Sequence, residues 1–111
     1  MKDDRLYLTN ILESIQRIES YTHAGKDAFV GSTQIQDAVI RNFEVSGEAV
    51  KPISDELKNA NADIPWRRIA GFRDVLIHDY RRIVLDEVWQ AVERDFPLLK
   101  SRIEQILENL A

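Results

Sequence analysis

The sequence predicts an all-α protein, an antiparallel bundle of four to five helices in a single domain over residues 1–111. Three observations lead to this prediction. Apolar residues recur at spacings of three and four, the period of a helix, and no stretch keeps the alternation typical of a strand. The 111 residues are about the size of one domain with its own core. Short polar connections between amphipathic segments favour antiparallel neighbours.

The first half of the chain is expected to hold two helices. The first covers residues 3–21, with an apolar stripe made by Leu8, Ile11, Leu12, Ile15 and Ile18. A connection with two glycines follows over residues 22–31. Thr33 and Gln36 have the spacing of a capping box, which predicts the start of a long second helix. Pro52 should kink or divide that helix, because it has no backbone N–H. The apolar residues of the second helix are Ile35, Val39, Phe43, Val50, Ile53 and Leu57.

The second half is expected to hold the remaining helices. A polar break over residues 59–63 precedes Pro65, which suits the first turn of a third helix that ends near Tyr80. Asp86 can cap a fourth helix, and Pro97 permits the start of a fifth. No repeat, low-complexity segment or second domain is evident.

Composition excludes several classes of protein. The chain has no cysteine, which rules out disulfides and thiolate metal sites and fits an intracellular protein. Its first residues are charged rather than apolar, and no apolar run approaches the ~20 residues that cross a bilayer. We therefore expect a cytoplasmic protein with no membrane association, no bound metal and no cofactor.

The charge is unevenly distributed along the chain. The formal net charge is −4, which argues against a protein that binds nucleic acid over most of its surface, and against a DNA-binding protein. Between Pro65 and Ile83, however, five arginines face only two aspartates. A cationic segment in an acidic chain predicts a localised anion site, although an arginine-rich surface helix would give the same composition.

This segment contains the pattern Arg73-x4-His78-x-Tyr80. It combines a guanidinium that is always charged with an imidazole that titrates near neutral pH. Cleavage of RNA without a metal needs a base for the 2′-hydroxyl, an acid for the leaving 5′-oxygen and a cation for the phosphorane. His78 suits the proton transfers, and Arg73 suits bidentate binding of the phosphate.

The spacing of the pair constrains how it can act. Five residues along an ideal helix is about 500°, so Arg73 and His78 would point ~140° apart. They converge only where the helix ends or where a second copy of the chain completes the site, which favours a symmetric dimer. Asp74 lies four residues before His78, so it can orient the imidazole or merely pair with it on the surface.

These and the neighbouring residues also have interpretations in which their role is only structural. A histidine near a helix end is commonly a capping or solvated residue, and His23 has no partner in the sequence. Trp66 has the spacing of a core residue. Arg67 and Arg68 fit either RNA phosphates or a solvated face.

The run from Pro65 to Tyr80 resembles the signature of HepT-like proteins within the HEPN superfamily. The block over 40–49, which includes Arg41, Asn42 and Glu44, also resembles the second helix of that family. Arg41 and Asn42 are therefore candidates either for substrate contact or for a buried network that holds the third helix. The resemblance covers essentially the whole chain.

The resemblance implies a metal-independent RNA endonuclease, the toxin of a toxin–antitoxin pair, which acts as a homodimer. Arg73 and His78 would be catalytic and would meet at the dimer cleft. The antitoxin would be a nucleotidyltransferase of the MNT type, which can transfer AMP to Tyr80. AMP there would place bulk and a negative charge within two residues of His78.

HepT proteins commonly continue after the motif with an aromatic residue and a glycine, whereas this chain has Arg81-Arg82. That difference affects how the following loop packs. The alternative function is a non-catalytic helical module that pairs with a nucleotidyltransferase and binds a nucleotide or that partner in the same cleft.

Overall fold

The computed structural model describes residues 3–71 and 85–110. Every regular element in these residues is helical, and they contain no strand, as the sequence predicted. The elements in chain order are α1 (Asp4–Tyr21), α2 (Lys26–Val30), α3 (Thr33–Val50), α4 (Asp55–Ala60), a helical stretch over 66–71, α6 (Leu85–Gln90), the π-helix η1 (Ala91–Asp95) and α7 (Phe96–Leu110). None of these helices is long and apolar enough to cross a membrane.

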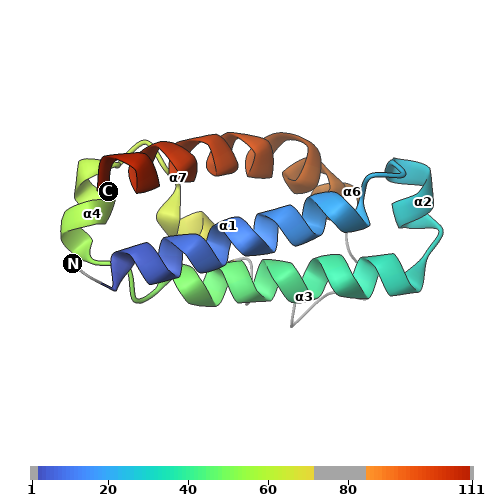
Figure 1. The fold of residues 1–111 in the computed structure, drawn as a ribbon. Helices are drawn as coiled ribbons and strands as arrows, with labels where there is room; N and C mark the ends of the chain where they lie inside the picture. The colour runs from blue at the N-terminus through green and yellow to red at the C-terminus, as the bar shows by residue number, and fades with distance from the viewer. Residues whose placement is uncertain (1–2, 72–84, 111) are drawn as a thin grey trace.

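Three long helices form the body of the molecule (Figure 1). α1 packs against both α3 and α7, and each of these runs antiparallel to it. The short helices α2 and α4 lie at opposite ends, and both chain termini lie at the end that carries α4. This elongated arrangement measures 41 × 27 × 20 Å.

The core lies where the apolar faces of the long helices meet. The rings of Phe43 on α3 and Phe96 on α7 pack edge to face with centroids 4.7 Å apart. Phe29 of α2 packs against Trp89 of α6 at 5.5 Å, which closes one end of the core. Aromatic pairs at such separations stabilise a core beyond the area they bury. The stripe predicted for the first helix is confirmed, because Leu8, Ile11, Ile15 and Ile18 are all buried.

The start of α3 differs from the prediction. Ser32, not Thr33, is the N-cap: its hydroxyl accepts a hydrogen bond from the Ile35 N–H at 3.2 Å. Gln36 donates instead to the carbonyl oxygens of Phe29 and Val30, at 3.1 and 2.9 Å. The capping-box prediction was therefore wrong by one residue, because Gln36 ties α3 back to α2 rather than completing a reciprocal cap.

The connections also differ in detail. The stretch over 22–31 contains the short helix α2, which begins after Gly25 at φ +96°, a conformation that favours glycine. The predicted second helix is divided at Pro52 as expected, since α3 ends at Val50 and α4 begins at Asp55. α4 extends to Ala60, so the polar break starts two residues later than predicted.

The last two predicted helices are one continuous helix. α6 continues into α7 through η1, and Pro97 is the second residue of α7 rather than the start of a separate element (Figure 1). In η1 the Phe96 N–H bonds to the carbonyl oxygen of Ala91, five residues earlier. Because Pro97 has no backbone N–H, it cannot make the hydrogen bond to the preceding turn that a residue inside a continuous helix normally makes.

Candidate functional site

The three motif residues, Arg73, His78 and Tyr80, lie outside the described residues, as do Asp74, Arg81 and Arg82. Their roles therefore stay predictions. The structure does describe the chain that leads into the motif, from the polar break through Gly71, and the helices on which this chain rests.

The helical stretch over 66–71 begins within one residue of the predicted start. Pro65 immediately precedes it, at the N-cap position rather than in the first turn, and its carbonyl oxygen accepts a hydrogen bond from the Ile69 N–H at 3.1 Å. Trp66 and Ile69 are buried in the core, which confirms the structural reading of Trp66. The Trp66 indole donates to the carbonyl oxygen of Asn61 at 3.1 Å, so the tryptophan also fixes the preceding turn.

Arg102 of α7 holds that turn by a forked interaction. Its Nε and Nη2 donate to the two carboxylate oxygens of Asp63 at 2.8 and 3.1 Å, and Nη2 also donates to Asn61 Oδ1 at 2.9 Å. Hydrogen bonds from Arg102 lower the pKa of Asp63 and raise the pKa of Arg102 in return. The planar guanidinium matches a carboxylate in a way that a lysine cannot.

A second ion pair holds the helical stretch itself. Arg68 Nη2 lies 3.0 Å from Asp95 Oδ2, and Asp95 is the last residue of η1. The π-turn thus places a carboxylate against the first turns of the helical stretch. The region before the motif is therefore tied to the C-terminal helix at two places, through Asp63 and through Arg68.

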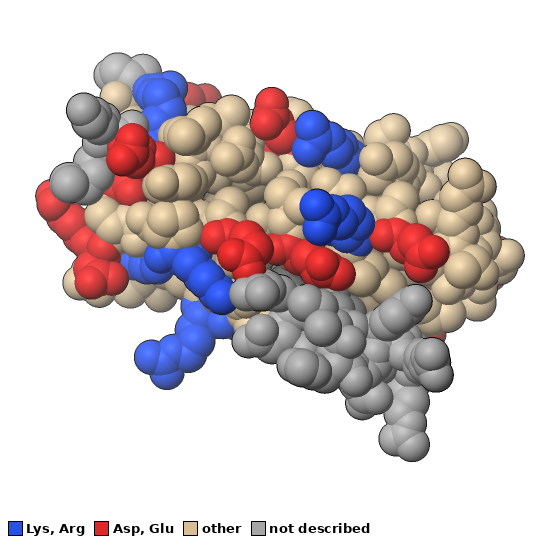
Figure 2. All heavy atoms as spheres, turned by 90° about the horizontal axis from the view of Figure 1, so that it is seen from below, with Lys and Arg blue, Asp and Glu red and all other residues tan. Residues whose placement is uncertain are grey.

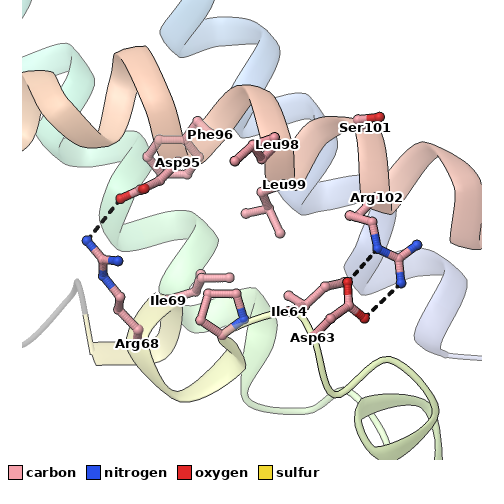
Figure 3. A pocket seen from close by; sticks show the side chains of 11 residues that line it. Asp63, Ile64, Arg68, Ile69, Asp95, Phe96, Leu98, Leu99, Ser101 and Arg102 are labelled. Carbon is pink, nitrogen blue, oxygen red and sulfur yellow. Dashed lines mark hydrogen bonds and ion pairs between the residues drawn. The ribbon is translucent and has the colours of Figure 1, made fainter.

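An apolar groove lies between these two ion pairs (Figure 3). Its volume is about 380 Å³, and Figure 3 shows the Arg68–Asp95 pair at one end and the Arg102–Asp63 pair at the other. The apolar side chains between them come from both sides of the groove and are Ile64, Ile69, Phe96, Leu98 and Leu99. Two positive and two negative side chains leave no net charge at its ends, so the groove does not suit a phosphate.

The remaining candidate residues do not gather at one place. Arg41 is 75% exposed, and its one ion pair among the described residues is a loose one with Glu44, at 3.9 Å. Asn42 is buried, and its amide donates to the carbonyl oxygen of Ala38 in its own helix at 2.9 Å. Arg41 lies in a groove between α1 and α3. Along α3, Arg41 lies about 15 Å from the end of the helix that is near Arg67.

Sequence reasoning missed Asp95 and Arg102, which anchor the candidate site. They lie 27 and 39 residues from their partners Arg68 and Asp63. No local spacing signals such pairs, because they form only when α7 folds back along the molecule. Within the described parts of the chain, no group of three or more His, Cys, Asp or Glu side chains is placed to hold a metal ion.

A family model described as "Ribonuclease HepT-like" matches residues 11–106. The chain belongs to this HepT-like family. The probable ribonuclease HepT of Thermococcus cleftensis is 39% identical over 101 residues, which are 90% of this chain and 92% of that protein. A "putative RNase" of Caldanaerobacter subterraneus is 33% identical over 98% of both chains.

A further relative is longer than this HepT-like chain. The "gamma-glutamylcyclotransferase and putative RNase" of Methanocaldococcus jannaschii is 44% identical over 98% of this chain but only 50% of its own length. The chain therefore spans about half of that relative. No solved structure matches the chain. The relatives support a ribonuclease of the HEPN superfamily, as the resemblance implied.

Proposed function

We propose that this HepT-like protein is a metal-independent RNA endonuclease that acts as the toxin of a toxin–antitoxin pair. The observation that carries the proposal is the intact Arg73-x4-His78-x-Tyr80 pattern in a chain of this family. The ion pairs to η1 and α7 support it, because they fix the described chain that precedes the pattern in the sequence. In the reaction, the 2′-hydroxyl of the adjacent ribose cleaves the phosphodiester.

In this reaction the 2′-oxygen attacks the phosphorus and the bond from phosphorus to the 5′-oxygen breaks. His78 takes the proton of the 2′-hydroxyl or delivers a proton to the departing 5′-oxygen. Arg73 stabilises the negative charge of the phosphorane. Because an ideal helix would present the two residues ~140° apart, the proposal includes a homodimer whose second copy completes the site.

The decisive test is RNA cleavage by the purified protein in the presence of EDTA. The products should end in 2′,3′-cyclic phosphate, and His78→Ala should reduce cleavage by at least about 100-fold, the usual contribution of a general acid or base. His23→Ala is a matched control. His23 is the only other histidine of the chain; it is exposed, and its Nδ1 lies 2.7 Å from the Ser20 carbonyl oxygen.

Wild-type rates in the His78→Ala protein would contradict the mechanism. Binding of RNA or a nucleotide without any cleavage by the wild type would instead favour a non-catalytic binding module.

The proposal extends to regulation in the cytoplasm by an MNT-type nucleotidyltransferase. The Tyr80 oxygen would attack the α-phosphorus of ATP, forming a phosphodiester to AMP and releasing pyrophosphate. The intact mass of the protein, made with and without the nucleotidyltransferase, tests this step. We expect the mass of one AMP to appear on the wild type and not on Tyr80→Phe, together with loss of cleavage.

A further inference from the structure

A second groove lies beside the helical stretch over 66–71, between this stretch and the corner from α3 to α4. Its volume is about 920 Å³. We call it the basic groove, because the described residues that line it include four basic side chains and a single acidic one, Asp55. The basic side chains are Lys51, Lys58, Arg67 and Arg68.

This concentration of positive charge is unusual for the molecule. The chain as a whole has a formal net charge of −4, and red and blue side chains are interspersed over the described part of the face in Figure 2. The groove between α1 and α3 is mixed as well, since Arg17 and Arg41 face Glu13, Glu44 and Glu48. The apolar groove has two charges of each sign. The basic groove therefore stands apart in its charge.

Three of the four basic side chains are available to a ligand, whereas Arg68 pairs with Asp95. Among the described residues, neither Lys58 nor Arg67 has an ion pair, and Lys51 has only a loose one to Glu48 at 3.9 Å. Lys58 donates one hydrogen bond, to the carbonyl oxygen of Lys51 at 3.4 Å, which leaves two of its three donors. That bond also brings the side chains of the two lysines to the same end of α3.

We propose that the basic groove binds the phosphate backbone of the substrate RNA, with Lys51 and Lys58 as binding residues in addition to Arg67. This inference rests on the proposed function, because it names the surface that holds the strand to be cut. Arg67 lies six residues before Arg73 in the sequence, so a strand in the groove runs beside the chain that enters the motif. Contacts to phosphate carry no base information, so binding here is independent of RNA sequence.

The test measures RNA binding separately from cleavage. In a His78→Ala background, the affinity for a labelled single-stranded RNA oligonucleotide is followed by fluorescence anisotropy from low to high salt. Lys51→Gln/Lys58→Gln should weaken binding by roughly tenfold at 0.1 M salt and flatten the logarithmic salt dependence by about 1.4, since each contact to a single strand contributes about 0.7. Two oligonucleotides of different base sequence should respond alike.

The matched control is Lys26→Gln/Lys100→Gln, which removes the same two charges elsewhere. Lys26 pairs with Asp86 at 3.3 Å, and Lys100 pairs with Glu19 at 3.0 Å, away from the groove. Because Lys58 also caps α3, Arg67→Gln serves as a second groove variant. It should flatten the salt dependence by about 0.7. Thermal melting by circular dichroism verifies that each variant is folded.

Three results would overturn the inference. In the first, the groove variants bind RNA as tightly as the His78→Ala background. In the second, the control variant loses as much affinity as the groove variant, which would show that binding depends only on the overall charge of the protein. The third is a groove variant with unchanged RNA binding but lost binding to polyglutamate, which would assign the groove to an acidic protein. Failure of the proposed function looks different, because wild-type protein would then bind RNA through the groove without cutting it.

Discussion

At the scale of single residues, Asp4 is the one charged residue that is buried in the described part of the chain. Its carboxylate accepts hydrogen bonds from the backbone N–H of Ser54 at 2.9 Å and from the Ser54 hydroxyl at 2.6 Å. Ser54 is in turn the N-cap of α4. One carboxylate thus joins the first turn of α1 to the start of α4, 50 residues later.

These contacts set the ionisation of the carboxyl group. Burial by itself raises the pKa of Asp4, but the hydrogen bonds from Ser54 and the positive charge of the chain's N-terminus together bring the pKa below the ordinary 3.8. A carboxyl whose pKa is lower in the folded state stabilises the fold above its unfolded pKa. That stabilisation disappears as the pH falls through the folded pKa.

We predict that Asp4→Asn lowers the free energy of unfolding by about 2 kcal/mol at pH 7, since hydrogen bonds to a charged group are worth about 1.5–3 kcal/mol. The difference from wild type should be complete at pH 6 and should shrink below about pH 4. Urea denaturation at several pH values measures it. Asp3→Asn, at the exposed neighbouring aspartate, is the control and should change stability little. A difference that persists unchanged at pH 2 would contradict this account.

At the scale of elements, the boundaries of helices depend on contacts that the local sequence leaves ambiguous. Ser32 and Thr33 are adjacent, and either hydroxyl can cap a helix. In the structure Ser32 is the N-cap, because its backbone angles are extended, whereas Thr33 is already helical. The sequence pattern placed Gln36 in the cap, but in the structure its side chain binds the end of α2.

The two candidate caps make opposite predictions for substitution. Ser32→Ala should destabilise the protein by about 1 kcal/mol, because the Ile35 N–H loses its acceptor. Thr33→Ala should cost much less. Chemical denaturation of the two variants distinguishes the alternatives, and a larger loss for Thr33→Ala would restore the capping box.

At the scale of the whole molecule, stability comes from the joint packing of α1, α3 and α7. Ile103 and Leu98 lie on the same helix, yet Ile103 is fully buried in the core and Leu98 is 71% exposed in the apolar groove. The same helix therefore offers a test of how much the shared core contributes.

We predict that Ile103→Ala lowers the free energy of unfolding by about 2–5 kcal/mol, because it leaves a cavity in the core. Leu98→Ala should stay within about 0.5 kcal/mol in the monomer. Urea unfolding at two protein concentrations checks both values. A loss at Leu98 that depends on protein concentration would show that a second copy covers the apolar groove.

Local sequence signals account for the helical class, the apolar stripe of α1, the division at Pro52 and the start of the helical stretch next to Pro65. These features are local, because the spacing of apolar residues and the missing N–H of proline act within one or two turns. The sequence also carried the family signature, in which residues 65–80 and 40–49 resemble HepT-like proteins.

Which residues far away in the sequence support the candidate site depends on the tertiary structure. Arg102 meets Asp63, Asp95 meets Arg68, and Lys51 joins Arg67 in the basic groove. Such partners are separated by 16 to 39 residues and meet only because α7 and the end of α3 pack on either side of one short helical stretch. Charge along the chain predicted an anion site near the motif, and the fold adds two lysines that lie before the arginine-rich segment.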